Sequence, residues 1–332
     1  MIYNNIIDLH GVSELECTAD GVFSTMRLPT SVYESLGDQG KSQCKNCTGV
    51  EFRFVINSGD VKLKFKYPED AKGEITVMHG DFVADWPETT KYLSGDCEIT
   101  VIQDKNIEIM RRIAKEYGHR FSPDVVRLLF RGVRPQIVEV NGDIRIPTED
   151  MLPKKIYLAY GSSITHGSIA LHSYYHYVER VAANLGADVT NYGLAGSCCL
   201  EKEVADFIAD KCEFDFATLE MGINILGMDP AEFERRVRYL VRRVATAHPN
   251  SKIFAIDVYY WGSDYTGTDK AANFREIVRR VVEELALPNV IYVNGKTVLT
   301  SPAGLSSGLC HPGPDGIFEM AQNLTEIIKK NI

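Results

Sequence analysis

Short apolar segments alternate with longer helix-like segments throughout the second half of the chain, and this alternation restricts the fold more than any other feature. The apolar runs lie at residues 156–160, 187–191, 216–221, 252–258 and 290–293. Between and after them, residues 173–185, 201–209, 230–247, 270–285 and 316–329 carry apolar residues at helical spacing. Five successive βα units predict an α/β fold with a doubly wound parallel sheet and helices on both faces.

The first half has a different pattern, with a period of two. Strand-like runs lie at residues 50–56, 61–67, 74–79, 97–102 and 125–130, and one helical stretch lies at 105–117. Residues 135–146 add two runs joined by Asn141-Gly142, which predicts a hairpin turn. Many short strands with polar turns favour an all-β sandwich of jelly-roll type. Residues 147–153 contain two prolines and two acids, so we predict a β-sandwich domain at 1–150 and an α/β domain at 151–332.

Composition excludes several classes of function. The chain has 332 residues, 45% of them hydrophobic, and a net charge of −9, which argues against a nucleic-acid or anionic-membrane partner. No apolar run is long enough to span a bilayer, and the start resembles no export signal, so we expect a cytoplasmic protein. The single C-x-x-C, at Cys44 and Cys47, has no second pair at metal spacing. We therefore expect reduced thiols and no metal site at this pair.

Unusual residues follow the predicted parallel strands. They are Gly161-Ser162-Ser163 after the first strand, Gly193 and Gly196 after the second, Gly222 and Asn224 after the third, and His311 before the last helix. The carboxyl ends of parallel strands meet at one edge, so these residues should converge there. A serine between a strand and a helix amino terminus suits a nucleophile whose attack creates an anion. Each residue also has an ordinary interpretation as a turn residue, and the Gly-Ser turn as a simple connection or a phosphate site.

Four segments, GSSITHG, NYGLAG, MGIN and CHPGPDG, resemble in order the four blocks of the SGNH (GDSL-type) hydrolase superfamily. The resemblance covers about residues 155–330. It implies a flavodoxin-like sheet and neither a metal nor an organic cofactor. It implies that Ser163 is the nucleophile and His311 the base. It also implies an oxyanion hole formed by the Ser163 and Gly193 N–H groups and the Asn224 amide. The preceding β domain is similar to amino-terminal modules of some esterases and acyltransferases of this superfamily.

The chain departs from the family pattern at two positions. Ser162 replaces the aspartate of the first block, and Gly308 stands where an aspartate usually precedes the histidine by three residues. The third member of a catalytic triad is therefore missing from its usual place. Either a main-chain oxygen orients His311 in a Ser–His dyad, or Asp315 or Glu220 supplies the acid. Asp315 could instead cap the last helix.

The resemblance implies a serine esterase that hydrolyses small acyl esters through an acyl-enzyme. An O-acetyl ester on a carbohydrate is the expected substrate, with Tyr259, Tyr260 and Trp261 as candidate contacts. An acyltransferase that uses the same acyl-enzyme, or an inactive carbohydrate-binding protein, remains an alternative. The β domain could bind sugar, shape the active site or form a homo-oligomer, with Trp86 and Tyr92 either contact or core residues.

Overall fold

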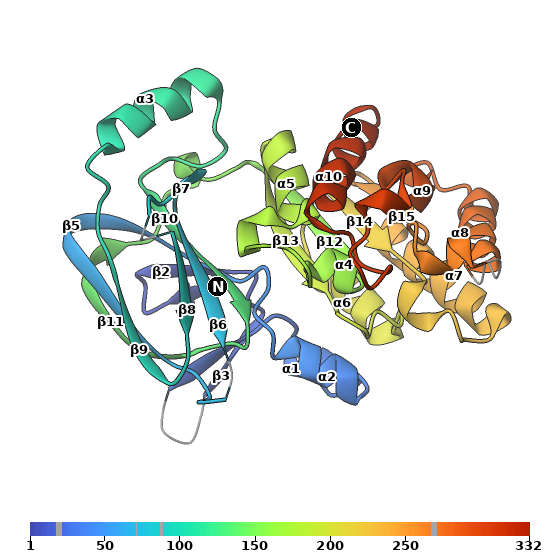
Figure 1. Ribbon diagram of the computed structural model, residues 1–332, viewed down its shortest axis with the longest axis horizontal. Helices are drawn as coiled ribbons and strands as arrows, with labels where there is room; N and C mark the ends of the chain where they lie inside the picture. The colour runs from blue at the N-terminus through green and yellow to red at the C-terminus, as the bar shows by residue number, and fades with distance from the viewer. Residues whose placement is uncertain (18–21, 71, 87–88, 267–270) are drawn as a thin grey trace. The chain divides into compact units, whose positions relative to one another are not determined.

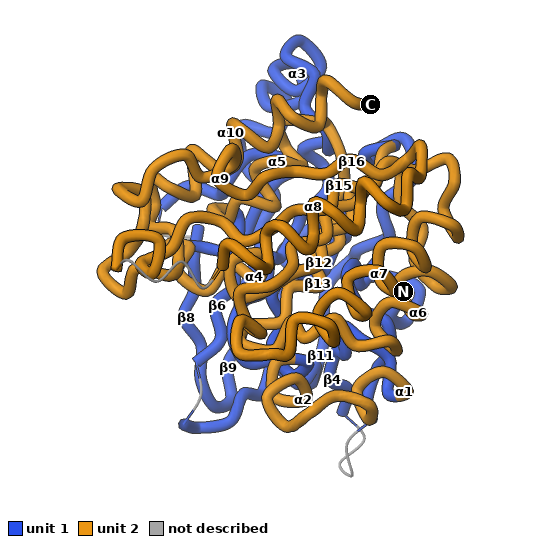
Figure 2. Tube along the Cα trace, turned by 90° about the vertical axis from the view of Figure 1, so that its right-hand side faces the viewer, with its two compact units in different colours: residues 1–30, 44–154, 172–174 blue, residues 31–43, 155–171, 175–332 orange. Residues whose placement is uncertain are grey.

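We describe the protein from a computed structural model, which covers residues 1–332 apart from 18–21, 71, 87–88 and 267–270 (Figure 1). The chain divides into two compact units (Figure 2). Unit 1 comprises Met1–Thr30, Cys44–Lys154 and His172–Tyr174, and unit 2 comprises Ser31–Gln43, Lys155–Leu171 and Tyr175–Ile332. Residues 31–43 group with unit 2, although the sequence pattern places them in the first domain. The proposed boundary at residues 150 and 151 stays a prediction.

Unit 2 is built on a five-stranded parallel sheet (Figure 1). Its order is β13 (Ala187–Gly193), β12 (Lys155–Gly161), β14 (Phe216–Glu220), β15 (Lys252–Ile256) and β16 (Val290–Val293). The chain passes from β12 to β13 on one side and then returns to β14 on the other. This 2-1-3-4-5 order confirms the flavodoxin-like prediction and places the reversal of strand order at β12.

Helices cover the sheet in two groups. One contains α5 (Tyr177–Leu185), α9 (Gly295–Val298) and α10 (Pro314–Lys329), and the other contains α6 (Lys202–Lys211), α7 (Pro230–Ala247) and α8 (Ala272–Leu285). The short α4 (Ser163–His166) follows β12 directly, and α1 (Thr30–Tyr33) and α2 (Asp38–Cys44) come from the amino-terminal half. Single 3₁₀ turns are η1 (Glu149–Met151), η2 (Ser173–Tyr175), η3 (Ile223–Ile225), η4 (Gly262–Tyr265) and η5 (Pro302–Gly304).

The apolar faces of α5 and α10 pack against the middle of the sheet. Val178 and Val181 on α5, and Met320 and Leu324 on α10, are fully buried with the side chain of Tyr157 on β12. Burial of such side chains typically contributes about 1.5–3 kcal/mol each. This packing fixes the strand ends that carry the candidate site.

Unit 1 contains an antiparallel sheet whose main order is β3 (Glu14–Cys17), β4 (Phe23–Met26), β11 (Gln136–Arg145), β5 (Glu51–Lys66), β10 (Val125–Gly132), β6 (Gly73–His79) and β7 (Phe82–Val83). Four further strands pair beside this path: β1 (Ile2–Tyr3), β2 (Ile7–His10), β8 (Thr90–Leu93) and β9 (Asp96–Val101). Inward-facing apolar residues of these strands form one core, as the predicted β domain requires. Helix α3 (Ile107–Tyr117) lies within the predicted helical stretch.

The gap between the strand-like runs at 50–56 and 61–67 predicts a turn at residues 57–60, and this turn and the predicted hairpin at 141–142 are both wrong. Residues 57–60 do not break a strand, because β5 runs without interruption from Glu51 to Lys66. The Asn141-Gly142 pair forms no hairpin, because β11 continues through it and pairs with β5 on both sides. Its register shifts around Asn141–Asp143, and Gly142 has a φ of +158°. Long-range pairing between β5 and β11 therefore overrides both local turn signals.

The C-x-x-C pair belongs to the interior rather than to a reactive site. Cys44 and Cys47 are both buried, and neither is part of a disulfide. Cys47 donates its S–H to the Gly132 carbonyl, and burial raises its pKa to about 12. A thiol that remains protonated at neutral pH is a poor nucleophile and a poor metal ligand.

Among the helices that the structure describes, none is both long and apolar enough to cross a membrane.

Candidate active site

The hydroxyl of Ser163 and the imidazole of His311 meet at the carboxyl edge of the unit 2 sheet. Ser163 is the first residue of α4, directly after β12, and His311 lies in the loop before α10. His311 Nε2 lies 2.7 Å from Ser163 Oγ, although the two residues are 148 positions apart in the chain. Burial lowers the pKa of His311 below its ordinary value of 6.5, so the ring is neutral at pH 7. A neutral imidazole at this distance can accept the serine proton.

The turn between β12 and α4 is held by the side chain of Ser162. Ser162 is the N-cap of α4 and accepts a hydrogen bond from the Ile164 N–H. With this group satisfied, the Ser163 N–H at the start of the helix has no partner among the described residues. Such an N–H, next to a serine Oγ, is suited to bind an anion formed on that serine's substrate.

Glu220, at the end of β14, stabilises this turn through hydrogen bonds. Its carboxylate accepts hydrogen bonds from the Ser162 N–H at 2.8 Å, the Ser162 hydroxyl at 2.6 Å and the Thr165 hydroxyl at 2.7 Å. Gly161 leaves room for this carboxylate, because a Cβ there would lie 2.4 Å from Glu220 Oε2. Burial raises the pKa of Glu220, and the hydrogen bonds from Ser162 and Thr165 offset this only in part. Glu220 therefore stabilises the turn between β12 and α4, which carries Ser163.

Neither candidate acid contacts His311. Glu220 hydrogen-bonds to Ser162 and Thr165, while Asp315 is exposed in the first turn of α10. Asp315 is not the helix cap, because Gly313 occupies the N-cap position, but its charge suits the helix amino terminus. Within the described part of the chain, His311 Nδ1 has no hydrogen-bonding partner. The structure therefore supports a serine–histidine pair and shows neither of the two acids beside it.

The Gly193 N–H is already engaged, which argues against its predicted role as an oxyanion donor. It donates to Asn191 Oδ1 at 2.8 Å, and the Asn191 amide in turn donates to the Thr165 carbonyl at 2.8 Å. A Cβ on Gly193 would lie 2.3 Å from the His166 nitrogen, so the glycine lets α4 pack directly on β13. A strand-end glycine can serve close packing as well as anion binding, and the oxyanion role of Gly193 stays a prediction that this hydrogen bond disfavours.

Gly196, three residues further along this loop, is a better candidate. It is exposed, has a φ of +68°, and its N–H has no partner among the described residues. Asn224 lies beside the same loop, because its Oδ1 accepts the Cys198 N–H at 3.0 Å. This hydrogen bond fixes the amide orientation and leaves Nδ2 as a donor. The sequence shows both glycines of NYGLAG, but it does not show which of their backbone N–H groups is hydrogen-bonded within the protein.

The three aromatic candidates separate in the structure. Tyr259 is 2% exposed and its hydroxyl donates to Tyr177, so it is a core residue and the predicted substrate contact is wrong. Tyr260 and Trp261 are only partly buried, and Lys296 Nζ lies 4.8 Å from the centre of the Tyr260 ring. Tyr259 faces inward because its side chain completes the packing around α5.

Arg275 and Asp264 hold the segment that carries Tyr260 and Trp261 in place. Sequence patterns did not indicate this role for either residue. Arg275 on α8 donates to the carbonyls of residues 258 and 259 and pairs with Asp264. Asp264 also accepts the Trp261 N–H at 3.1 Å. These contacts hold the aromatic segment against α8.

The same segment is joined to the loop that carries the base. The Gly262 N–H donates to the carbonyl of Leu309, two residues before His311. Within the described ranges, no group of three or more His, Cys, Asp or Glu side chains could hold a metal ion.

This fold and site define a class: a flavodoxin-like α/β unit with a serine nucleophile candidate and its base at the sheet edge. Residues 159–316 match the model of the GDSL-like lipase/acylhydrolase family. The chain thus contains a GDSL-like lipase/acylhydrolase domain, and the resemblance to the SGNH superfamily is confirmed. No curated protein matches the sequence.

Solved structures resemble the whole chain. A salicylyl-acyltransferase, SsfX3, from a tetracycline biosynthetic pathway is 19% identical with a TM-score of 0.73, covering 98% of this chain and 94% of that chain. A family two carbohydrate esterase from Clostridium thermocellum, in complex with cellohexaose, is 13% identical with a TM-score of 0.63 over 98% of both chains. The acetyl xylan esterase Est2A of Butyrivibrio proteoclasticus is 11% identical with a TM-score of 0.59 over 99% and 96%. At these identities the likeness shows the fold alone.

Proposed function

We propose that the protein is a serine esterase that removes small acyl groups, above all O-acetyl groups, from a carbohydrate. The observation that carries this proposal is the 2.7 Å contact between His311 Nε2 and Ser163 Oγ at the carboxyl edge of the sheet. The family match at residues 159–316 supports acyl hydrolysis. The sugar substrate is supported by the carbohydrate esterases among the similar folds and by the aromatic side chains of Tyr260 and Trp261, whose segment is bonded to the His311 loop.

The reaction begins when His311 takes the hydroxyl proton of Ser163 and the oxygen attacks the ester carbonyl. The tetrahedral oxyanion accepts hydrogen bonds from the Ser163 N–H, the Asn224 Nδ2 group and the Gly196 N–H, which we propose in place of Gly193. Each donor of this kind typically stabilises the transition state by about 3–4 kcal/mol. His311 then gives its proton to the sugar oxygen as the bond between that oxygen and the acyl carbon breaks. Water, activated by the same imidazole, releases the carboxylic acid and restores Ser163.

Hydrolysis of a small chromogenic ester such as p-nitrophenyl acetate tests this proposal. Wild-type protein should release acetate and p-nitrophenol in equal amounts, and Ser163→Ala should not. If the wild-type protein shows no turnover of this ester or of an acetylated sugar, the esterase proposal is wrong. That result would favour the alternative of an inactive carbohydrate-binding protein.

An acyltransferase is the second candidate, because the structure resembles that of a salicylyl-acyltransferase along nearly its whole length. In this case an alcohol replaces water in the second step and accepts the acyl group from Ser163. Product analysis with an added sugar or other alcohol distinguishes the two reactions. A transferase forms a new ester in proportion to the acceptor, whereas a hydrolase releases free acid.

A further inference from the structure

Unit 1 contains a small hollow with an exposed tryptophan at its rim. The hollow has a volume of about 270 Å³ and is lined by the ends of β6 and β9, the segment after β7 and the loop that leads to α3. Its volume is just below the range of roughly 300–1,000 Å³ that is usual for ligand sites. A site of this size accommodates one or two rings of a polar ligand rather than an extended partner.

The rim residue is Trp86, whose side chain is 84% exposed. Its backbone N–H donates to Asp85 Oδ1 at 2.8 Å, so the segment next to the indole is held by a local hydrogen bond. An exposed indole beside a hollow offers a flat ring on which a ligand can stack. The face of an indole carries partial negative charge and attracts the slightly positive C–H groups on the apolar face of a sugar ring.

The floor of the hollow carries His79, at the end of β6, which is only 5% exposed. Its ring has no hydrogen bond to any residue that the structure describes. Burial lowers the pKa of His79, so the ring is neutral and offers one N–H donor and one acceptor nitrogen. Because no described residue is hydrogen-bonded to these ring nitrogens, a ligand hydroxyl in the hollow can bind them. Hydroxyl groups, which both donate and accept, match this pair of functions.

The remaining lining combines apolar and polar side chains, and its two acids outnumber its one base, Lys105. Asp104 Oδ1 accepts the Asn106 N–H at 2.7 Å, which leaves its second oxygen for a ligand. Gln103 and Thr100 add further donors and acceptors. An excess of carboxylates beside the hollow disfavours an anionic ligand. A neutral ligand with many hydroxyl groups and one apolar face fits all these features.

We propose that this hollow, defined by His79, Asp85, Trp86, Thr100, Gln103 and Asp104, is a binding site for a pyranose unit of a neutral glycan. Trp86 stacks on the apolar face of the sugar, and His79 and Asp104 bind its hydroxyls. This site goes beyond the proposed esterase reaction, because it lies in unit 1 and uses none of the residues around Ser163. It would hold the protein on a polysaccharide whether or not the bound sugar carries an ester.

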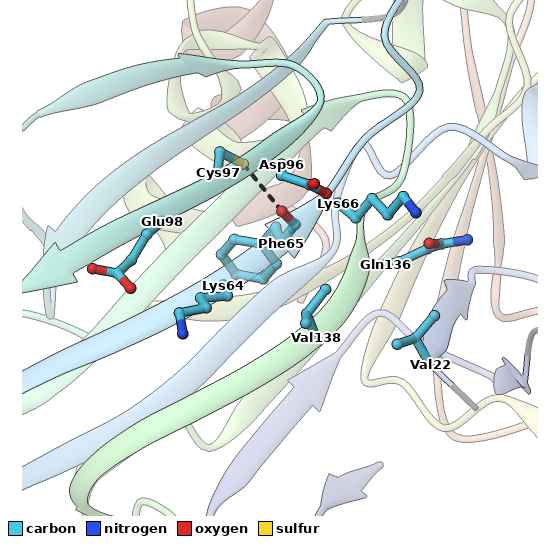
Figure 3. A pocket seen from close by; sticks show the side chains of 9 residues that line it. All are labelled: Val22, Lys64, Phe65, Lys66, Asp96, Cys97, Glu98, Gln136 and Val138. Carbon is cyan, nitrogen blue, oxygen red and sulfur yellow. Dashed lines mark hydrogen bonds between the residues drawn. The ribbon is translucent and has the colours of Figure 1, made fainter. Parts of the chain in front are cut away.

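A second hollow in unit 1, of about 540 Å³, provides a comparison. Figure 3 shows its lining from β5, β9 and β11, with Lys64, Lys66 and Glu98 around it. Its one aromatic residue, Phe65, is 1% exposed and belongs to the core. Lys64 is paired with Glu139 at 2.5 Å. This hollow offers no ring on which a sugar could stack, so it supplies control variants.

The proposal is tested by affinity gel electrophoresis with soluble polysaccharides from which all esters have been removed. A panel of xylan, glucomannan, mixed-linkage glucan and galactan is used, so that binding is measured without any esterase activity. We expect at least one of them to retard the wild-type protein. Trp86→Ala should weaken binding about tenfold or more, and Trp86→Phe should restore part of the loss.

Two control variants should bind as the wild type does. Tyr92→Ala removes another exposed aromatic ring of the same unit, on β8, and Gln136→Ala alters the hollow of Figure 3. Trp86 and Trp261 are the two tryptophans of the chain, so Trp261→Phe leaves Trp86 as the single indole fluorophore. Titration of this variant with an oligosaccharide of the retarding polysaccharide should change its emission saturably.

Three results would each overturn the proposal. The first is that no polysaccharide of the panel retards the wild-type protein. The second is that Trp86→Ala, with an unchanged melting temperature, binds as tightly as the wild type. The third is that Gln136→Ala abolishes binding instead. Because no ester is present in these measurements, failure of the esterase proposal leaves the outcome unaffected.

Discussion

The Glu220 carboxylate accepts two hydrogen bonds from Ser162, one from its N–H at 2.8 Å and one from its hydroxyl at 2.6 Å. Ser162 in turn caps α4, whose first residue is Ser163. A buried acid thus positions the turn that presents the nucleophile, although it does not touch His311. The residue that replaces the family's usual aspartate therefore has a defined structural partner 58 positions away in the sequence.

Ser163→Ala should reduce kcat/KM for a small acetate ester by at least about a thousandfold while the melting temperature stays within a few degrees of wild type. The reason is that its hydroxyl contacts His311 and contributes no core packing. Ser162→Ala is the matched control. It removes the cap and one partner of Glu220, so it should lower stability by about 0.5–2 kcal/mol and retain measurable turnover. If Ser162→Ala were inactive and Ser163→Ala active, the assignment of the nucleophile would be wrong.

Asn224→Ala should lower kcat about a hundredfold or more with little change in KM, because it removes one oxyanion donor. The variant also removes the acceptor of the Cys198 N–H, so its melting temperature must be measured alongside. Asn224→Asp is a useful comparison, since it keeps that acceptor and loses the amide donor. Equal activity of Asn224→Asp and wild type would exclude the donor role.

The activity of the wild-type protein should depend on pH through His311. The base must be neutral to accept the Ser163 proton, and burial lowers its pKa below 6.5. As the pH falls through that lowered pKa, His311 becomes protonated and kcat/KM should decline. Above about pH 6.5 kcat/KM should be level, as measured by a pH profile with a small acetate ester. If kcat/KM instead fell with a midpoint above pH 7, the pKa of the base would be raised, which would contradict a base without a neighbouring carboxylate.

Gly308→Asp should leave activity unchanged or raise it. The backbone at Gly308 does not have a positive φ, and a Cβ there would meet no atom closer than Ser306 Oγ at 4.0 Å. A carboxylate near His311 would stabilise the imidazolium and so move the acid limb of the pH profile to higher pH. If the variant folds properly and its kcat/KM declines at the same pH as that of the wild type, the introduced carboxylate does not reach the ring.

Replacing either of the two existing acids should have a smaller effect. Asp315→Asn should cost less than about tenfold in kcat/KM, because Asp315 is exposed on α10 and shows no contact with His311. A loss of about a thousandfold with the fold preserved would identify Asp315 as a relocated triad acid.

Glu220→Gln should also cost less than about tenfold in kcat/KM, and its main effect should be on stability. Burial raises the pKa of Glu220 above its ordinary value of 4.5, so the folded protein binds this proton more tightly than the unfolded chain. Its contribution to stability is therefore present below pH 4.5 and is lost as the pH rises through the raised pKa. Thermal melts should show that this part of the pH dependence disappears in Glu220→Gln. An unchanged dependence would contradict the role assigned to burial.

The order of the elements in unit 2 followed from the sequence alone. Apolar periodicity is a local property, and the five βα units therefore lie close to their predicted positions, from β12 at Lys155–Gly161 to α10 at Pro314–Lys329. Parallel strands present their carboxyl ends at one edge, so the meeting of Ser163 and His311 could also be expected. The family resemblance in four short blocks rested on the same residues.

The partner of each polar group was decided by the tertiary structure. The family resemblance pointed to Gly193, but its N–H donates to Asn191 Oδ1, and the Asn191 amide is held by the Thr165 carbonyl, 26 positions away in the chain. Likewise Tyr259 and Tyr260 are neighbours of one type, yet the direction of the chain after β15 buries the first and leaves the second partly exposed. In unit 1, the pairing of β5 with β11 overrode the turn signal at residues 141 and 142. Hydrogen-bond partners and burial depend on residues distant in the chain, which local patterns do not encode.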